Sequence, residues 1–443
     1  MDREVIGQGS ALSASPPSYR AFFAQPYAKL VAVGLLLSRI TAYMWRLTIV
    51  LLVLEYFHSP VLAGTVALLG WLPGSLLSPV AGALLDRHTK VSLILLDYGI
   101  AACTNSTIAV LAITGTLRPA ALLILVALGS LTVPLSNSGL RTLLPAFVPS
   151  RLWDQLNAVD SITADIAAVG GPALAGICVA AIGPRWTMLL IVLVLVSAAV
   201  SIIPVKEPAP STQAGGWGRV IKDAIGGVRY VFLHPILRAL IATQPIANVG
   251  LGMLQIILPV RILQTLQGSS QDVGFVWAGF GLAGVLGALT AARIRTMDRE
   301  VRWMTVTLVL QGVAVLPALF IQRLPFVYLG MAIAGAMTGL HDVALFSLRL
   351  RTLESRWLGR GITISMHLNS IGEPIGAGIA GLIAQTHLLF ASWVVPIVFG
   401  GAGAITPGVF AASGYRPPSE DLDIRLPSTA EAESRIRNRT GDS

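Results

Sequence analysis

Charged residues are scarce in this chain. Only 12% of its 443 residues are Asp, Glu, Lys or Arg, whereas 54% are hydrophobic and the mean hydropathy is +0.74. Soluble domains carry roughly 25% charged residues, and a soluble protein of this length could not keep so much apolar surface away from water. The composition therefore excludes an ordinary soluble protein and predicts one whose solvent is the lipid bilayer.

The sequence also lacks the patterns of redox, metal and nucleotide chemistry. Its two cysteines, Cys103 and Cys178, lie inside apolar runs and form no disulfide framework. The six histidines have no metal-ligand spacing, and no glycine-rich loop ends in Gly-Lys-Ser or Gly-Lys-Thr. We therefore expect a protein that is not an enzyme, needs no cofactor or metal, and does not use ATP.

The most prominent feature is a series of twelve long apolar runs. A helix needs about 20 such residues to cross the hydrocarbon of a bilayer. The expected fold class is an all-α polytopic membrane protein with twelve transmembrane helices in two six-helix halves, 27–205 and 237–413. The helices are predicted at 29–56, 60–84, 91–115, 119–144, 155–182, 185–205, 237–263, 272–294, 302–322, 325–349, 359–384 and 388–412.

Three segments lie outside these halves. The tails at 1–26 and 414–443 are polar, and the composition of the second, rich in Arg and Glu, predicts disorder. In the central segment 206–236, apolar and basic residues are interleaved, which predicts a helix lying on the membrane surface. A regulatory partner site is the alternative for this segment.

The basic residues predict an orientation. The formal net charge is +9. With the N-terminus in the cytoplasm, 25 Lys and Arg residues fall on cytoplasmic segments, and the opposite face has only Arg118, Arg185, Arg261 and Arg323. Because basic loops remain in the cytoplasm, we predict a multi-pass protein of the cell (inner) membrane with both termini cytoplasmic. The charge is then a topology signal, and we expect no nucleic acid partner.

An internal repeat relates the two halves. Parallel six-helix repeats are how one class of secondary transporters is built, with the substrate bound between the halves near the midplane. Three pairs of similar strings recur in the same order at offsets of 202 or 205 residues: 169–177 with 371–379, 80–86 with 285–291, and 150–153 with 355–358.

The loop after the second span carries a resemblance to a known family. GALLDRHTK (82–90) is similar to the loop signature of the Major Facilitator Superfamily, which Gly82, Asp86, Arg87 and Lys90 all match. The resemblance implies a conformational latch, in which a glycine allows close helix approach and the charges hold the two halves together on the cytoplasmic side. The equivalent loop of the second half keeps the glycine but lacks the Asp.

The fifth span carries a second resemblance. Gly171, Pro172 and Gly176 look like the glycine-proline signature of the antiporters of this superfamily, although Ala167 and Ala175 stand where glycine is usual. Small residues allow close packing and proline bends a helix. The signature implies a helix interface between the halves, with ordinary tight packing as the alternative.

The layout as a whole most resembles the bacterial branch of enterobactin and macrolide exporters. The strings that carry this resemblance are SPVAGALLDR (78–87), DQLNAVDSI (154–162) and YVFLHPILRALI (230–241). That branch often has an acidic residue in the first span near Ala42, whereas this chain has Arg39 and Arg46 there. The resemblance therefore does not identify the substrate.

Ionisable residues inside the spans are candidate site residues, because their burial is costly and usually serves a cavity or a partner. Arg39 and Arg46 are seven residues apart and share one face of the first span. Arg39 lies about 15 Å into its helix, at 1.5 Å per residue, and Asp165 lies at a similar depth in the fifth span. We expect an Arg39–Asp165 pair, and Arg46, with no evident partner, could contact an anionic group of the substrate.

The second half offers a further set of candidates. Glu373 occupies the position that Gly171 holds in the first half, so the duplication gives no structural reason for a carboxylate there, and a carboxylate that gains and loses a proton can couple transport to a gradient. Its alternative roles are helix capping and hydrogen bonding to a neighbouring helix. Further candidates for substrate binding or coupling are Gln244, Asn248, Gln255, His341 and Asp342. Interhelical hydrogen bonds are the alternative for Gln244, Asn248 and Gln255.

The predicted function is secondary active export of a small molecule, such as a drug, a siderophore or a secondary metabolite, by alternating access in exchange for protons. An importer or facilitator of the same fold is one alternative, because these motifs do not fix the direction of transport. A membrane scaffold or sensor is the other, although a scaffold has no use for Arg39, Arg46 and Glu373 inside its spans. We expect a monomer that contacts membrane lipids.

Overall fold

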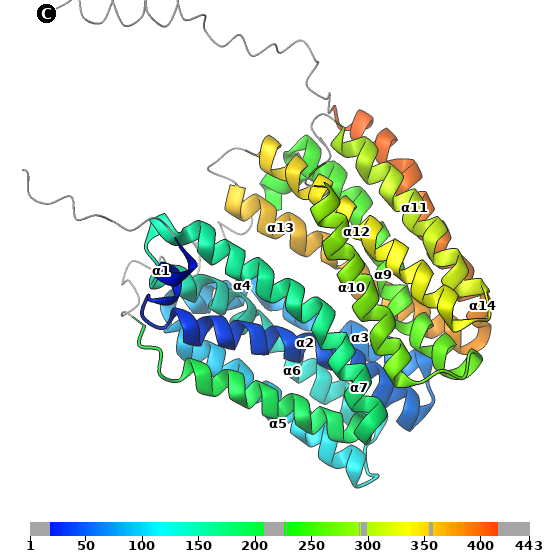
Figure 1. The fold of residues 1–443 in the computed structure, drawn as a ribbon, viewed down its shortest axis with the longest axis horizontal. Coiled ribbons are helices and arrows are strands. Elements are labelled where there is room, and N and C mark those ends of the chain that lie inside the picture. Colours follow the sequence, from blue (N-terminus) through cyan, green and yellow to red (C-terminus); the bar gives the residue numbers. More distant parts are fainter. Residues whose placement is uncertain are drawn as a thin grey trace, which may run out of the picture.

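The computed structural model describes residues 18–207, 226, 228–291, 293, 299–353 and 358–414. In these ranges the chain is helical and has no strand. Ten helical segments are long and apolar enough to cross a membrane, so the predicted all-α membrane fold is confirmed. The helices (Figure 1) are α1 (Tyr19–Phe23), α2 (Ala28–Phe57), α3 (Pro60–Leu69), α4 (Leu72–Arg87), α5 (Lys90–Ile113), α6 (Pro119–Leu143), α7 (Trp153–Ile202), α9 (Pro235–Val260), α10 (Ser270–Ala291), α11 (Glu300–Phe320), α12 (Leu324–Thr352), α13 (Leu358–Ser370) and α14 (Gly372–Ala412), with short η turns at Leu144–Ala146, Ser150–Leu152 and Arg261–Thr265.

Two of the ten segments are long enough for two crossings each. Ser150–Ile202 has 53 residues and Ile364–Ala412 has 49. Helix α7, in the first, is interrupted at Gly183, whose φ of +79° is left-handed backbone that glycine adopts without strain. Helix α14, in the second, is interrupted at His387 (φ −141°, ψ 69°). Each interruption separates two stretches of helix, which makes the structure consistent with the twelve predicted spans.

The span predicted at 60–84 is divided into two helices. Helix α3 ends at Leu69 and α4 begins at Leu72, with Trp71 in a non-helical conformation between them. The physical cause is Pro73, which has no N–H group and whose ring would clash with the carbonyl group four residues earlier, that of Leu69. This break lies in the wall of the cavity described below.

The segments predicted to lie outside the membrane fall mostly outside the described residues. This applies to nearly all of the tail at 414–443, to most of the tail at 1–26 and to most of the central segment 206–236. The last part of the first tail is helical, because α1 begins there with the hydroxyl of Ser18 accepting a hydrogen bond from the backbone N–H of Ala21.

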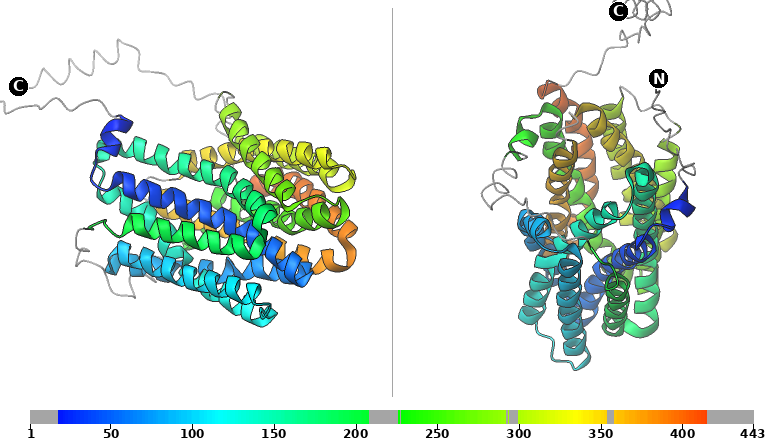
Figure 2. Two further views of the ribbon diagram at one scale, coloured as in Figure 1. Left: turned by 60° about the horizontal axis from the view of Figure 1, so that its bottom comes forward. Right: turned by 90° about the vertical axis from the view of Figure 1, so that its left-hand side faces the viewer.

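The two halves meet at one end of the bundle. We call the end where α2 begins the Ala28 end, and the end where it finishes the Phe57 end. Toward the Phe57 end, α3 packs on α14 and α7 packs on α10. From there the helices of the two halves diverge toward the Ala28 end (Figure 1). Figure 2, right, shows the blue and cyan helices of the first half below the orange and red helices of the second.

Glycine makes both of these contacts possible. A methyl group on Gly176 of α7 would lie 2.7 Å from the Cα atom of Gly274 of α10, and one on Gly381 of α14 would lie 3.0 Å from the Cα atom of Gly64 of α3. Such close approach of two backbones requires small residues. The fifth and eleventh spans carry the sequence repeat, and the second and eighth do as well, so the two contacts occupy equivalent places in the duplicated fold.

Candidate transport cavity

A cavity of about 270 Å³ lies on the Ala28 side of the contacts between the halves. Its lining residues Ala67 on α3 and Glu373 on α14 come from turns nearer the Ala28 end than Gly64 and Gly381. Most of the wall belongs to α2 to α6, and the second half contributes Gln255, His367, Glu373 and Pro374. The volume is close to the lower limit, about 300 Å³, of pockets that hold drug-sized molecules.

The wall combines apolar and aromatic surface with a few polar groups, as sites for organic molecules do. Three aromatic side chains belong to it, those of Trp45, Trp71 and Tyr98. The indole N–H of Trp45 donates a 2.8 Å hydrogen bond to Asn105 Oδ1, which fixes the orientation of that ring. The charged residues of the wall are Arg46, Asp97 and Glu373.

An ion pair joins the two halves across this cavity. Arg46 Nη1 on α2 lies 3.5 Å from Glu373 Oε1 on α14, and the amide of Gln255 on α9 donates a hydrogen bond to the same oxygen. The side chains of Arg46 and Glu373 are 47% and 30% exposed, so both remain within reach of a solute in the cavity. The sequence indicated no partner for Arg46, and the structure supplies one because the fold brings the eleventh span against the first.

Arg39 is paired differently from the prediction. Its guanidinium group contacts Asp160 Oδ1 at 2.6 Å and Thr163 Oγ1 at 2.6 Å, and it also donates to the Asp160 carbonyl group. The side chain of Asp165 is exposed and forms no ion pair among those of the described residues. The predicted Arg39–Asp165 pair is thus replaced by Arg39–Asp160, which fastens α2 to α7 inside the first half.

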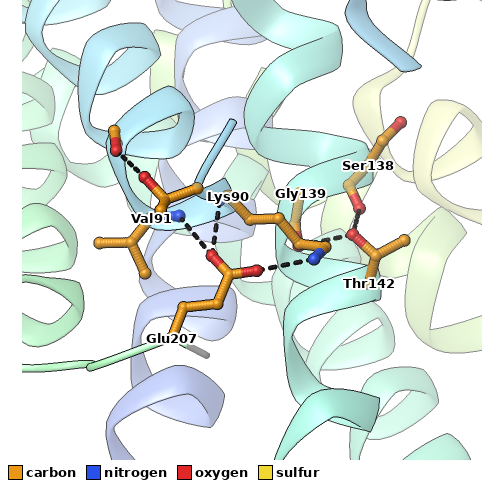
Figure 3. A network of polar contacts seen from close by, with 8 residues as sticks. Lys90, Val91, Ser138, Gly139, Thr142 and Glu207 are labelled. Carbon is orange, nitrogen blue, oxygen red and sulfur yellow. Dashed lines mark hydrogen bonds and ion pairs between the residues drawn. The ribbon is translucent and has the colours of Figure 1, made fainter. Parts of the chain in front are cut away.

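The loop with the superfamily signature contacts its own half. Figure 3 shows Lys90 beside Glu207, which follows the sixth span: Glu207 accepts hydrogen bonds of 2.6 Å from both the Nζ atom and the backbone nitrogen of Lys90. A methyl group on Gly82 would meet no atom within 4 Å, so this glycine permits no close helix approach in this conformation. Arg87 is half-buried, and the side chain of Asp86 lies outside the described set. In this conformation the ion pair of Lys90 does not join the two halves, because its partner Glu207 directly follows the sixth span.

The glycine-proline signature of the fifth span faces two helices. A methyl group on Gly171 would lie 3.4 Å from the Ile40 carbonyl oxygen on α2, within the same half. The Pro172 carbonyl oxygen would lie 2.6 Å from a methyl group on Gly274, and Gly176 contacts the same glycine. Pro172 and Gly176 thus lie at the contact between the halves, and Gly171 packs inside the first.

The remaining candidates of the second half lie outside the cavity wall. His341 Nε2 is hydrogen-bonded to Gln244 Oε1 at 2.8 Å, and His341 Nδ1 to Thr307 Oγ1 at 3.2 Å. The Asn248 amide donates to the Asn369 carbonyl group at 2.8 Å. These contacts tie α9 to α12 and α13, which is the interhelical alternative considered for Gln244 and Asn248.

Asp342 also lies outside the wall, although its side chain is exposed. Its carboxylate interacts electrostatically with the buried guanidinium group of Arg349, which lies about two helical turns further along α12. The geometry thus gives Asp342 a charged neighbour on its own helix and no place in the cavity.

Three acidic residues of the structure were not among the predicted site residues. Asp160 and Glu207 are the partners of Arg39 and Lys90, and Asp97 lies in the cavity wall. Asp97 could have been found, because it is an ionisable residue inside the span predicted at 91–115. In the described ranges no group of three or more His, Cys, Asp or Glu side chains could hold a metal ion.

The sequence matches a family of membrane transporters over most of its length. A family model described as "Transmembrane secretion effector" matches residues 18–405. An MFS-type transporter of Sinorhizobium fredii, y4rN, is 35% identical over 373 residues, covering 84% of this chain and 92% of that protein. The multidrug efflux pump Tap of Mycolicibacterium fortuitum is 24% identical, covering 87% and 93%, and the enterobactin exporter EntS of Shigella boydii is 25% identical, covering 82% and 85%.

Solved structures share the fold at much lower identity. The nucleoside transporter NupG superposes with a TM-score of 0.67 at 10% identity, covering 88% of this chain and 99% of that one. The human organic anion transporter MFSD10 superposes with a TM-score of 0.61 at 16% identity, covering 86% and 98%. The duplicated helices, the loop signature at 82–90 and the family match over 18–405 together show that the chain is a membrane transporter of the Major Facilitator Superfamily, related to the enterobactin and multidrug exporters, and not an enzyme.

Proposed function

We propose that this chain exports a small organic molecule across the cell membrane by alternating access, in exchange for protons. The observation that carries the proposal is the contact of Arg46 with Glu373 and Gln255 in the cavity wall. This ion pair joins the two halves, which none of the ion pairs of Arg39, Lys90 and Arg351 does. A change in the charge of this pair therefore alters the contact between the two halves. Alternating access requires the two halves to move relative to each other.

Glu373 is the group that would carry the proton. A proton on its carboxylate removes the negative charge that attracts Arg46 and weakens the bond across the cavity. Loss of that proton restores the attraction. If Glu373 faces one side of the membrane after the other, the proton gradient is converted into a change in the contact between the halves, and the cavity moves its solute in the opposite direction.

The direction of export is supported by the relatives and by the distribution of charge. Two relatives are named as an exporter and an efflux pump. The basic loops support a cytoplasmic location for the Ala28 end, and a cavity on that side would take its substrate from the cell interior. Reporter fusions at residues 212 and 430 test this orientation, and both should report a cytoplasmic location. A signal from the far side of the membrane would exclude it.

The loop residues Gly82, Asp86, Arg87 and Lys90 would control the conformational change. In this conformation the space beside Gly82 is open, which leaves room for a helix of the second half to approach when the Ala28 end closes. Asp86→Asn should then impair transport without lowering the amount of protein in the membrane. Transport at the normal rate would exclude the latch.

The function is tested by measuring the accumulation of a panel of toxic compounds and metabolites in cells with and without the protein. Cells with the protein should hold less of at least one compound, and an uncoupler of the proton gradient should abolish the difference. Greater accumulation in cells with the protein would indicate an importer. Equal accumulation of every compound in cells with and without the protein would favour a membrane scaffold or sensor.

A further inference from the structure

Asp97 is a second acidic group in the cavity, and the coupling scheme above does not use it. It lies on α5, about 10 Å from the start of the helix at 1.5 Å per residue, and its side chain belongs to the cavity wall. Only 4% of Asp97 is exposed. A carboxylate this deeply buried requires a partner, because removing a charge from water costs several kcal/mol.

The described residues leave Asp97 without a balancing charge. Its Oδ1 atom has no hydrogen-bond partner among them, and none of their ion pairs includes it. The hydroxyl groups of Ser136 and Thr132 are its polar neighbours. Both hydroxyl groups hydrogen-bond the carboxyl group, but neither carries a charge, and Oδ1 keeps a free acceptor position.

The other charges of the wall do not compensate Asp97. Arg46 lies 3.5 Å from Glu373, and that pair is neutral as a unit. Among the Asp, Glu, Lys and Arg side chains of the wall, Asp97 is therefore the one without an ion-pair partner, and a cationic solute would meet it in the cavity. A carboxylate with a free acceptor oxygen suits the N–H group of a protonated amine or the positive charge of a quaternary nitrogen.

The aromatic side chains restrict the ligand further. Trp45, Trp71 and Tyr98 line the same cavity as Asp97, and aromatic faces attract both flat apolar rings and cations. The ring of Trp45 is held by its hydrogen bond to Asn105. A flat aromatic molecule with a single positive charge would satisfy the apolar wall and the unpaired carboxylate together.

We infer that Asp97 binds the positively charged nitrogen of a flat aromatic monocation, which is the substrate class of this cavity. The inference rests on the proposed function and deepens it, since it names the class of solute. It separates two tasks between two carboxylates: Asp97 of the first half recognises the solute, and Glu373 of the second half responds to the proton.

A pair of isosteric probes tests this inference. The 10-methylacridinium cation and the neutral 10-methylacridone have nearly the same size and shape, and the fluorescence of each reports binding to the purified protein in lipid discs. Wild type should bind the cation at least about tenfold more tightly than the neutral probe, which corresponds to about 1.4 kcal/mol. Equal affinities in wild type, or no binding of the cation, would overturn the inference without any variant.

Three variants locate the preference. Asp97→Asn should lower the affinity for the cation at least about tenfold and leave that for the neutral probe within about twofold, whereas Asp97→Glu should retain the preference. Asp165→Asn is the control, because it removes an exposed carboxylate that does not belong to the cavity wall. A preference that survives Asp97→Asn, or that disappears in Asp165→Asn alone, would contradict the assignment.

The two proposals fail in different ways. Equilibrium binding needs no proton gradient, so the probe experiment gives its answer even if export is not driven by protons. Conversely, a protein whose cation preference does not depend on Asp97 can still show gradient-driven export. Size-exclusion profiles and thermal unfolding identify a variant that has lost its fold, and the comparison of the two probes in wild type then still decides the case.

Discussion

Glu207 accepts two hydrogen bonds of 2.6 Å from Lys90, one from the side chain and one from the backbone. Lys90 is the first residue of α5, and Thr89, the residue that precedes the helix, makes no side-chain capping bond. The Glu207 carboxylate therefore caps this helix from the end of the sixth span. An anion at a helix N-terminus also interacts favourably with the helix dipole. The contact fastens the third span to the sixth at the Ala28 end.

We predict that Glu207→Ala destabilises the first half. Glu207 is only 6% exposed, and its loss would leave a backbone N–H group and the Lys90 ammonium group without their acceptor. We expect a decrease of about 1–3 kcal/mol in the free energy of unfolding, measured as a lower midpoint of thermal unfolding in detergent. Glu207→Gln, which keeps an acceptor oxygen, should lose less. Equal stability of wild type and Glu207→Ala would show that the contact is energetically neutral.

A second prediction concerns the pairing inside the first half. Asp160→Asn should destabilise the protein by about 1–3 kcal/mol, because it weakens a charge-assisted bond to Arg39 in a partly buried site. Asp165→Asn is the matched control on the same helix and should change stability by no more than about 0.5 kcal/mol, since its side chain is exposed. A larger loss of stability in Asp165→Asn than in Asp160→Asn, measured in the same unfolding assay, would instead support the predicted Arg39–Asp165 pair.

The error over Arg39 shows which part of the site the sequence can predict. Depth in the membrane can be counted along a helix, and that count placed Arg39 and Asp165 at similar levels. The direction in which a side chain points is harder to predict, because it depends on how the helix is rotated. Asp160 and Asp165 are five residues apart, which separates them by about 140° around the axis, and packing of α7 on α2 directs Asp160 toward Arg39.

The fold was more predictable than the site for a related reason. Span number depends on long apolar runs, which the bilayer requires of any chain that crosses it. The contacts of Arg46 with Glu373 and of Lys90 with Glu207 join residues 327 and 117 positions apart, and no local pattern in the sequence encodes them. The internal repeat made one residue of the site predictable, because it showed that Glu373 is a carboxylate where the first half has Gly171.

A third prediction concerns the contact that closes the Phe57 end. Gly176→Ala would place a methyl group 2.7 Å from the Cα atom of Gly274 and 2.8 Å from the Ser270 carbonyl oxygen. Backbone atoms cannot move aside cheaply, and overpacking of this kind costs about 1–3 kcal/mol. The variant should therefore disfavour the conformation in which the halves meet here, and the cavity should be less often open at the Ala28 end.

Thiol labelling measures this change. With Cys103 and Cys178 replaced by Ser, a cysteine introduced in place of Ser75 in the cavity wall would be labelled from the Ala28 side by an impermeant maleimide. Gly176→Ala should slow the labelling at least about fivefold, for a shift of about 1 kcal/mol. Gly170→Ala is the control, since a methyl group there would meet no atom within 4 Å. Equal rates in the two variants would mean that the contact does not control opening.

The last prediction separates a coupling role for Glu373 from a structural one. Glu373→Gln resembles the permanently protonated carboxyl, because it has a similar shape and no charge, and it can still bond to Gln255. If Glu373 carries the proton, membrane vesicles with this variant should exchange an exported panel compound at close to the wild-type rate under counterflow, because counterflow needs no net movement of protons. Uphill export driven by a pH gradient should fall at least about tenfold.

A purely structural Glu373 predicts that both activities survive, since Gln keeps most of the hydrogen-bonding capacity. Loss of both activities would indicate that the bond to Arg46 itself is required for the conformational change, and Arg46→Gln should then show the same double loss. Normal gradient-driven export by Glu373→Gln would remove Glu373 from the coupling mechanism and leave Asp97 as the acidic side chain of the cavity wall to be tested in its place.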